Sequence, residues 1–479
     1  MLNIEFMTRV LRYFLLISLL FVAVGVVSAQ EDESIRGLHK VKRKETIFGI
    51  SRMYEITIEE LIEANPEMKN PDYELKKGDI LRIPFSSNPS NHRDSSDPSQ
   101  ASQTSTASNA SNSSDASRTS TSSDDDVRNR AIRLGVMLPL HDINGDGRRM
   151  VEYYRGVLMA CDSLKKIGIS VDVHAWNTPE DGDIRPILLD DAATKCDMII
   201  GPLYSKQMDV LSEFVKHYDI RLVIPFSINA PQLTTNRNIF QIWQSPTAIN
   251  EATITHFMER FKEYHPVFID CNDSTSNKGN FTSRLRRELE QQGIEYAVTN
   301  LKSGEDSFSK AFSPKKQNVV ILNTGRSQEL GVAFSKINGL TTKSPDLDIT
   351  MFGYTDWLMY TRAHLDNYYK YNTYIPSTFY YNPMSSATQR LQQKYRWNFH
   401  ADMQTILPRF AITGFDHAYF FLRGLHKYGK TFNGAAGMFG YPPVQTPLQF
   451  ERYGNGGLRN NTLLFVHYKP EHLVETIKF

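Results

Sequence analysis

The sequence HKVKRKETIFGISRMYEITIEELIEANPEMKNPDYELKKGDILRIP, residues 39–84, predicts a small module with the order strand, helix, helix, strand. His39 to Lys42 is expected to form the first strand, and Thr46 can cap the helix that follows. Apolar residues recur at helical spacing after this cap and would share one face of the helix. They are Ile47, Ile50 and Tyr54.

The second half of this segment also carries clear start and stop signals. Thr57 and Glu60 have the spacing of a capping box, which predicts the start of a second helix. Asn65-Pro66 ends that helix, because the residue before a proline disfavours the helical conformation. A turn at Gly78 then leads into a closing strand from Ile80 to Pro84.

This segment resembles the LysM family over its whole length. The shared motifs are Glu-Thr-Ile from residue 45, Tyr-x-Ile-Thr from 54, Leu-x-x-x-Asn-Pro from 61 and Leu-x-x-Gly-Asp-x-Leu-x-Ile-Pro from 75. The first turn departs from the pattern, since Lys44-Glu45 stands where the family usually has Gly-Asp. That departure bears on affinity more than on fold.

The LysM resemblance implies binding of N-acetylglucosamine chains, in peptidoglycan or chitin. The groove would lie between the first turn and the loop after the second helix, where backbone amides would hold acetamido carbonyls. Thr46 and Ile47 have the alternative of serving only the helix cap and the core. The implied groove residues are Glu45, Thr46, Ile47, Phe48, Asn65, Pro66 and Glu67.

The remainder of the chain shows an exported, multidomain organisation. Arg9 and Arg12 precede an apolar run and small residues at 27–29, so residues 1–29 are predicted to be a signal peptide cleaved after Ala29. An uncleaved anchor helix is the alternative, although the run is shorter than the ~20 apolar residues of a membrane span. We therefore expect a location in the periplasm or cell envelope, with no stable membrane span after cleavage.

A short polar stretch, residues 30–38, separates this leader from the module. Residues 85–130 are rich in Ser and Thr and predict a disordered linker, because such a segment buries too little apolar surface to offset its ordering entropy. A chain of 479 residues suggests two or three folded units. Its 54 basic and 53 acidic residues give no indication of a nucleic-acid partner.

From residue 131 on, short apolar runs alternate with amphipathic stretches, which predicts α/β lobes built on parallel sheets. One lobe would contain about 131–245 and 378–440, and the other about 246–377 with the C-terminal strands. The predicted strands are 132–140, 171–176, 197–201, 221–225, 266–271, 296–301, 318–323, 349–352 and 462–468. The predicted helices are 150–166, 186–193, 207–217, 251–263, 281–293, 327–337 and 412–427.

Ligands of open α/β sheets bind beyond the carboxyl ends of the strands. At these ends the sequence places hydroxyl, amide and carboxylate side chains that suit a small polar ligand. Ser205 follows a buried strand and would either help to bind an anion at a helix start or act as the helix cap. The candidate cleft residues are Tyr204, Ser205, Ser227, Asn229, Asn323, Thr324 and Asp356.

Residues 199–234 resemble the type I periplasmic binding proteins for branched amino acids, and the order of elements fits from residue 132 to 478. The resemblance implies that Ser205 contacts a ligand carboxylate, whereas Asn229 replaces the second hydroxyl residue. In that family an acidic residue after the strand that ends at Asn323 would bind the ligand's α-amino group. Thr324-Gly325-Arg326 stands there instead, so a free amino acid does not fit. With these departures, the domain is also similar in fold to the outer-membrane activator of penicillin-binding proteins. That family acts by contacting synthases.

Metal and catalytic motifs are weak or missing. The calcium-loop opening Asp-x-Asn-x-Asp-Gly starts at Asp142, but Tyr153 occupies the closing position, so a polar turn is the better interpretation. Cys161 and Cys196 could form a disulfide, although buried inert thiols, including Cys271, are the simpler expectation. No familiar catalytic signature is present, so we expect neither an enzyme nor a cofactor.

Two hypotheses follow from the sequence. The first is a peptidoglycan-binding exported protein that anchors a non-enzymatic solute-binding domain at the cell wall. The second is a regulator or scaffold of wall synthesis or of an envelope complex that acts through protein contacts, with a vestigial cleft. A wall hydrolase with an unfamiliar site is a weaker third. The dense aromatics of the C-terminal third would pack in the core or, alternatively, form a contact surface.

Overall fold

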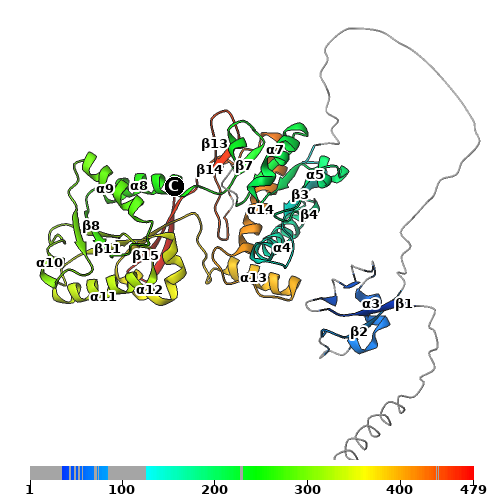
Figure 1. Ribbon diagram of the computed structural model, residues 1–479, viewed down its shortest axis with the longest axis horizontal. Helices are drawn as coiled ribbons and strands as arrows, with labels where there is room; N and C mark the ends of the chain where they lie inside the picture. Colours follow the sequence, from blue (N-terminus) through cyan, green and yellow to red (C-terminus); the bar gives the residue numbers. More distant parts are fainter. Residues whose placement is uncertain are drawn as a thin grey trace, which may run out of the picture. The chain divides into compact units, whose positions relative to one another are not determined.

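The computed structural model describes residues 35–42, 45–47, 50–51, 54, 56, 58–69, 73, 75–84, 126–226, 230–438, 440 and 442–479. It divides into two compact units, residues 1–115 and 116–479, which are described separately (Figure 1). The predicted signal peptide, most of the predicted linker, and Phe48, Ser227 and Asn229 lie outside the described residues.

The first unit is built on a two-stranded antiparallel sheet. Strand β1 (Ile35–Lys40) pairs with β2 (Ile80–Pro84), and α3 (Ile58–Ala64) and the 3-10 helix η1 (Pro66–Lys69) lie between them in the sequence. The pairing begins at Ile35, so the strand includes residues that the sequence pattern assigns to the polar stretch. The buried core consists of Val41, Ile50, Ile56, Leu61, Met68, Leu81 and Ile83.

The second unit contains two seven-stranded sheets. We call the first sheet and its helices the first lobe, with the strand order β13-β14-β7-β6-β5-β3-β4. Its strands are β3 (Ile132–Leu138), β4 (Val171–Asn177), β5 (Met198–Ile200), β6 (Arg221–Ile224), β7 (Ile239–Gln241), β13 (Phe450–Arg452) and β14 (Leu458–Asn460). Its main helices are α4 (Gly145–Lys165), α7 (Met208–His217), α13 (Ser386–Phe399) and α14 (Phe410–Tyr428).

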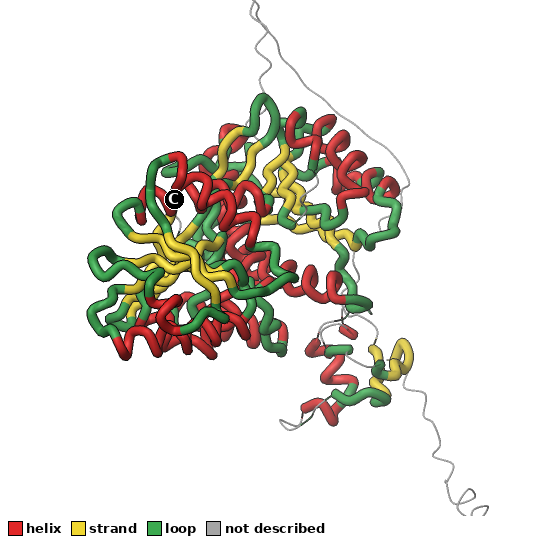
Figure 2. Tube along the Cα trace, turned by 60° about the vertical axis from the view of Figure 1, so that its left-hand side comes forward, coloured by secondary structure: helices red, strands yellow, loops and turns green. Residues whose placement is uncertain are grey.

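The second lobe repeats this architecture with the order β16-β15-β12-β11-β10-β8-β9. Its strands are β8 (His265–Asp270), β9 (Ala297–Asn300), β10 (Asn318–Leu322), β11 (Ile349–Phe352), β12 (Thr373–Ser377), β15 (Leu464–Lys469) and β16 (Leu473–Lys478). Its helices are α8 (Pro246–Phe261), α9 (Gly279–Gln291), α10 (Glu305–Ser309), α11 (Ser327–Lys343) and α12 (Thr361–Lys370). Figure 2 shows helices flanking the strands.

The α/β class predicted from the sequence is confirmed, with one addition. Strands β3 to β7 pair in parallel, as do β8 to β12, whereas each sheet ends in antiparallel pairs, β13–β14 and β12–β15–β16. Strands β13 and β14 were not predicted and join the first sheet, and β7 and β12 also lie outside the predicted strands. Parallel strands connected through helices therefore form the body of each lobe.

Three segments connect the two lobes, residues 242–245, 378–385 and 461–463. Two of them are joined by hydrogen bonds. Gln244 Nε2 donates to the carbonyl of Thr462 at 2.8 Å, and Asn460 Nδ2 donates to the carbonyl of Ile242 at 3.1 Å. The first and third connections therefore run together as a bonded pair.

Helices α4 and α14 pack unusually closely in the first lobe. A Cβ added to Gly156 would lie 1.9 Å from the carbonyl oxygen of Ala411, and one added to Gly414 would lie 2.0 Å from that of Tyr153. Only glycine permits such backbone contact. Within the part of the chain that the structure describes, no helix has both the length and the apolar character needed to cross a bilayer.

Core packing accounts for many of the aromatics in the C-terminal third. Trp357 and Tyr368 are fully buried and their rings stack, with centroids 6.1 Å apart. Cys161, Cys196 and Cys271 are all free thiols, so the Cys161–Cys196 pairing is not formed. Burial is the largest cause that raises the pKa of each thiol, to about 12, which matches the alternative of inert thiols.

Candidate functional site

The first turn of the small unit is organised by a carboxylate. Glu45 Oε2 accepts a hydrogen bond from the backbone amide of Lys42 at 2.7 Å and lies 2.8 Å from His39 Nε2. The other ring nitrogen of His39 lies 2.9 Å from the hydroxyl of Tyr54. The Lys42 amide and then the His39 bond lower the pKa of Glu45. Glu45 thus holds the turn at the position where this sequence departs from the Gly-Asp of the LysM pattern.

Asn65 has a structural task at the end of α3. Its side chain is fully buried and donates to the carbonyls of Leu61 at 2.7 Å and Arg82 at 2.8 Å. Its Oδ1 also accepts the amide of Arg82 at 2.7 Å. Both amide protons are therefore used within the protein, and a glycan could contact this residue only through its backbone.

The other predicted groove residues differ in exposure. Thr46, Pro66 and Glu67 are exposed, whereas Ile47 is half-buried against the core. Phe48 lies outside the described residues. The first turn and η1 therefore offer polar and ring surfaces to solvent, and Asn65 fixes the position of η1 from beneath.

At the strand ends of the first lobe, Tyr204 and Ser205 lie at the start of the short 3-10 helix η3 (Ser205–Gln207). The Tyr204 hydroxyl donates to Asp146 Oδ2 at 3.5 Å, and Ser205 is exposed. Tyr204 is the N-cap residue of η3 and Gln207 that of α7, so Ser205 is not the helix cap that the sequence offered as an alternative. Its predicted partners Ser227 and Asn229 lie outside the described residues.

The Asp-x-Asn-x-Asp-Gly segment forms the start of α4. Asn144 caps the helix, because its side chain accepts the amide of Gly147 at 2.9 Å. Asp146 is bonded to Arg149, and Asp142 lies 4.0 Å from Arg148. Among the residues described, no three His, Cys, Asp or Glu side chains are grouped so that they could hold a metal ion.

The second lobe gathers its polar residues around Asp273. Thr275 donates to its Oδ1 at 2.7 Å and Thr324 donates to its Oδ2 at 2.8 Å. Arg326 Nη1 lies 3.5 Å away. These hydroxyls, Thr275 first, and then the guanidinium lower the pKa of Asp273 to about 2. The loops after β8 and β10 are therefore held together by an ionised carboxylate.

Asn323 and Asp356 are also engaged within the second lobe. Asn323 Nδ2 donates to Asp270 Oδ1 at 2.9 Å, and its Oδ1 accepts the amide of Cys271 at 2.8 Å. Asp356 forms an ion pair with Lys278 at 2.7 Å. Parallel strand topology thus brings Asn323, Thr324 and Asp356 to one edge of the sheet, where all three bind side chains of the same lobe.

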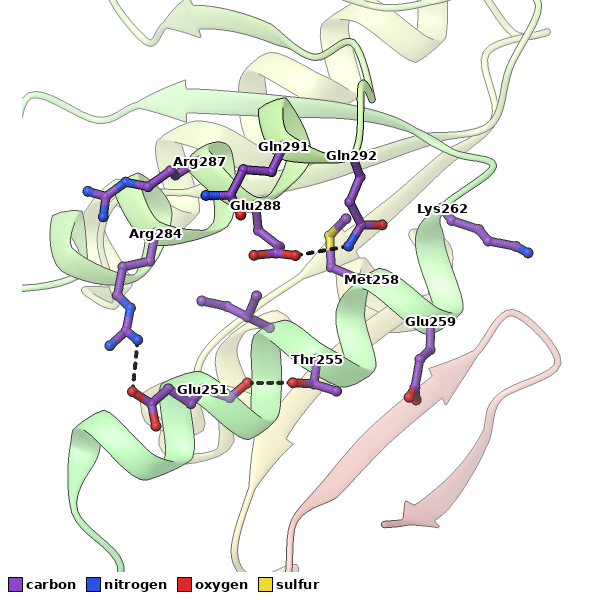
Figure 3. Close-up of a pocket in the computed structure, with 11 residues that line it drawn as sticks. Glu251, Thr255, Met258, Glu259, Lys262, Arg284, Arg287, Glu288, Gln291 and Gln292 are labelled. Atoms are coloured by element: carbon purple, nitrogen blue, oxygen red, sulfur yellow. Dashed lines mark hydrogen bonds and ion pairs between the residues drawn. The ribbon is translucent and has the colours of Figure 1, made fainter.

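A hollow lies between helices α8 and α9 (Figure 3). Its volume is about 800 Å³, it shares lining residues with a cavity of about 430 Å³, and that cavity in turn shares lining residues with one of about 210 Å³ next to the lobe connections. Arg284 and Arg287 line both of the larger cavities. Sequence reasoning missed this feature because it considered strand ends. The available signal was the helical spacing of Asn280, Arg284, Arg287 and Gln291.

Comparison with known families and structures bears on both units. Residues 39–84 match the family described as LysM domain. No curated protein matches the sequence. A putative branched-chain amino acid ABC transporter from Rhodospirillum rubrum has a similar structure, with a TM-score of 0.50 and 14% identity, covering 73% of this chain and 100% of that one.

Two further structures align less closely. Full-length LpoA from Haemophilus influenzae has a TM-score of 0.44 and 12% identity, covering 73% of this chain and 59% of that one. An ABC transporter substrate-binding protein from Sphaerobacter thermophilus has a TM-score of 0.42 and 13% identity, and the match covers 73% of this chain and 98% of that one. Residues 39–84 are thus a LysM domain, and the two-lobed unit has a type I periplasmic-binding-protein-like fold.

Proposed function

We propose that this chain is an exported, non-enzymatic protein that binds peptidoglycan through its LysM domain and holds a ligand-binding domain at the cell wall. The LysM match at residues 39–84, joined in one chain to a two-lobed binding-protein fold, is the observation that carries this proposal. The apolar segment before residue 29 supports export.

Sedimentation with insoluble peptidoglycan tests the glycan arm. The full chain is expected to sediment with the polymer, and a chain lacking residues 39–84 is expected to stay in solution. Glu67→Ala and Thr46→Ala change exposed residues of the proposed groove and should weaken binding severalfold. Lys77→Ala, at an exposed turn outside that groove, is the matched control. Equal sedimentation with and without the LysM domain would reject this arm.

In the second unit, we propose a small polar ligand bound between the strand ends of the two lobes. Tyr204, Ser205, Ser227 and Asn229 would bind it from the first lobe, and Asn323, Thr324 and Asp356 from the second. Exposure of Ser205 supports its access to a ligand. The test is a screen of wall fragments and amino acids for a rise in melting temperature that Ser205→Ala reduces. A screen without any shift would count against capture of such ligands.

A second candidate function is regulation of wall synthesis or of an envelope complex through protein contacts. It is favoured by one observation, that Asn323, Thr324 and Asp356 already bind other side chains of their own lobe. Trp397 on α13 is 83% exposed, and a protein partner would cover such a side chain. Under this candidate Trp397→Ala abolishes partner pull-down, whereas Ser205→Ala leaves it unchanged. A ligand-dependent melting shift that Ser205→Ala reduces and Trp397→Ala leaves unchanged favours ligand capture instead.

The non-enzymatic part of the proposal has its own test. Purified full-length protein incubated with peptidoglycan is expected to release no soluble fragments. Release of muropeptides or glycan fragments above a heat-inactivated control would instead support the wall-hydrolase hypothesis.

A further inference from the structure

The groove between α8 and α9 has a basic end. Its cavity of about 430 Å³ is lined by Lys278, Arg284 and Arg287, and no carboxylate lines it. Asn250, Asn277 and Asn280 add amide groups around these cations. The volume lies within the range of small-molecule sites, which is roughly 300–1,000 Å³.

Two helices begin at this cavity. Pro246 and Thr247 belong to the first turn of α8, and Asn280 and Phe281 belong to the first turn of α9. The partial positive charges of both helix N-termini therefore add to the field of the three cations. An anion would be stabilised here by contributions from two separate helices and from their side chains.

The three cations differ in how much of their charge is balanced. Lys278 lies 2.7 Å from Asp356, and Arg284 lies 2.8 Å from Glu251 across the groove (Figure 3). Arg287 makes no ion pair with any residue that the structure describes. Its guanidinium is the uncompensated positive charge of the cavity and has its bidentate donors available.

The opposite end of the groove has a different character. Beyond Arg284 and Arg287, the 800 Å³ hollow is lined by Glu259, Glu288 and Lys262 together with the side-chain amides of Gln291 and Gln292. Charges of both signs and amides alternate there, as the sticks in Figure 3 show. An anionic group is therefore favoured at one end only, with space for an uncharged polar remainder at the other.

We propose that this groove is a second ligand site, which is centred on Arg287 and borders the strand-end cleft at the Lys278–Asp356 pair, and that it binds a small molecule by a carboxylate or phosphate group. Arg287 provides the principal contact to the anion, Lys278 and Arg284 surround it, and the hydroxyls or amides of the ligand extend along α8 and α9. The buried side chains of Phe281 and Tyr354 also line the cavity.

Calorimetric titration of the full chain with inorganic phosphate and, separately, with glutarate tests this site and identifies the preferred oxyanion. Saturable binding of at least one anion is expected, weakening as salt is raised because exposed charges are screened. Arg287→Ala should weaken it about tenfold or more, since it removes a charge-assisted bidentate contact. Arg287→Lys keeps the charge, so its affinity for the anion should lie between that of the unmodified chain and that of Arg287→Ala. Glycerol, which carries no charge, should not bind.

Arg362→Ala is the matched control, because Arg362 is an exposed arginine of the same lobe on α12, outside the groove. It should bind the anion as the unmodified chain does, and so should Ser205→Ala in the other lobe. No saturable binding of either anion, or an equal loss in Arg362→Ala and Arg287→Ala, overturns the proposal. Loss in Ser205→Ala alone would assign the anion to the cleft.

Discussion

The first lobe leaves Ser205 exposed at its strand ends, with Tyr204 reaching Asp146 only at 3.5 Å. The second lobe places Asn323 and Thr324 at the equivalent edge and bonds both to aspartates at 2.9 and 2.8 Å. The two lobes share a parallel-sheet architecture, so topology does not cause this contrast. It arises from which side chains follow each strand.

The contrast separates two meanings of a polar residue at a strand end. In the first lobe the polar residue Ser205 is exposed to solvent. In the second lobe such a residue closes a loop, because an acceptor from the neighbouring strand end lies within hydrogen-bonding distance. Buried polar groups are stabilising only when they are bonded, so the second lobe depends on these contacts for its own structure.

The largest expected effect concerns helix packing in the first lobe. Gly414→Ala would force a methyl group to within 2.0 Å of the Tyr153 carbonyl, so the free energy of unfolding should fall by about 3 kcal/mol. In the second lobe Gly339 of α11 has no atom near its added Cβ, and Gly339→Ala should raise stability by about 0.5–1 kcal/mol. Urea denaturation measures both. Equal effects of the two substitutions would contradict this packing difference.

A smaller effect compares the two strand-end residues directly. Asn323→Ala leaves the Cys271 amide without its acceptor and removes the bond to Asp270, so stability should fall by about 1–3 kcal/mol. Ser205→Ala should change it by less than about 0.5 kcal/mol, because Ser205 is exposed. Thermal and urea unfolding provide the measurement. A Ser205 variant as unstable as the Asn323 variant would remove the distinction between the lobes.

The next effect is the change of stability with pH in the acidic range, which has opposite signs in the two lobes. Hydrogen bonds lower the pKa of Asp273 from 3.8 to about 2 in the second lobe, so its contribution is present above pH 3.8 and lost as pH falls through 2. Burial raises the pKa of Glu152 above 4.5 in the first lobe, so stability is greatest below 4.5 and falls as pH rises through the raised pKa.

Unfolding measured in urea across this pH range distinguishes the two carboxyl groups. Stability should fall between the ordinary pKa of 3.8 and the lowered pKa of about 2 in the unmodified chain. Asp273→Asn should reduce this loss of stability. Glu152→Gln should instead flatten the decline above pH 4.5. A variant of either residue with the pH profile of the unmodified chain would show that the group does not titrate as its surroundings indicate.

The smallest effect on stability belongs to the ion pair at the edge of the second lobe. Lys278 and Asp356 side chains are 26% and 46% exposed, so water and salt screen their attraction. Lys278→Met should therefore lower the free energy of unfolding by only about 0.2–1 kcal/mol. Thermal unfolding at low and high salt measures it. A loss comparable to that of Asn323→Ala would indicate that the pair is more than a surface contact.

Sequence patterns predicted the LysM domain well because its cues are local. Thr57 and Pro66 mark the predicted limits of a single helix, and its observed bounds, Ile58–Ala64, lie between them. Asn65 was predicted to line the groove, yet its side chain bonds to Leu61 and Arg82. Long-range partners such as Arg82 cannot be found from local spacing. The roles proposed for the groove residues stay predictions.

In the large unit most of the long periodic segments were predicted, but the helices α12 and α13 and several short or irregular strands were not. β7 has only three residues, Ile239–Gln241, too few for a periodic signal, and β12 contains Pro376, which normally argues against a strand. The sheet rule correctly brought Asn323, Thr324 and Asp356 to one edge. It could not show that Asp270, Asp273 and Lys278 would bind them, since those contacts depend on loop geometry.

The bonded connections between the lobes limit how one lobe can turn against the other. Gln244 and Asn460 tie the first and third connecting segments at two points, so these segments resist sliding past each other. The middle connection is held separately, because the amide of Tyr380 donates to the carbonyl of Gln445 at 3.0 Å. A rotation of one lobe that slides the first connection along the third would break these two bonds, whereas a bend that keeps the two connections together would leave them in place.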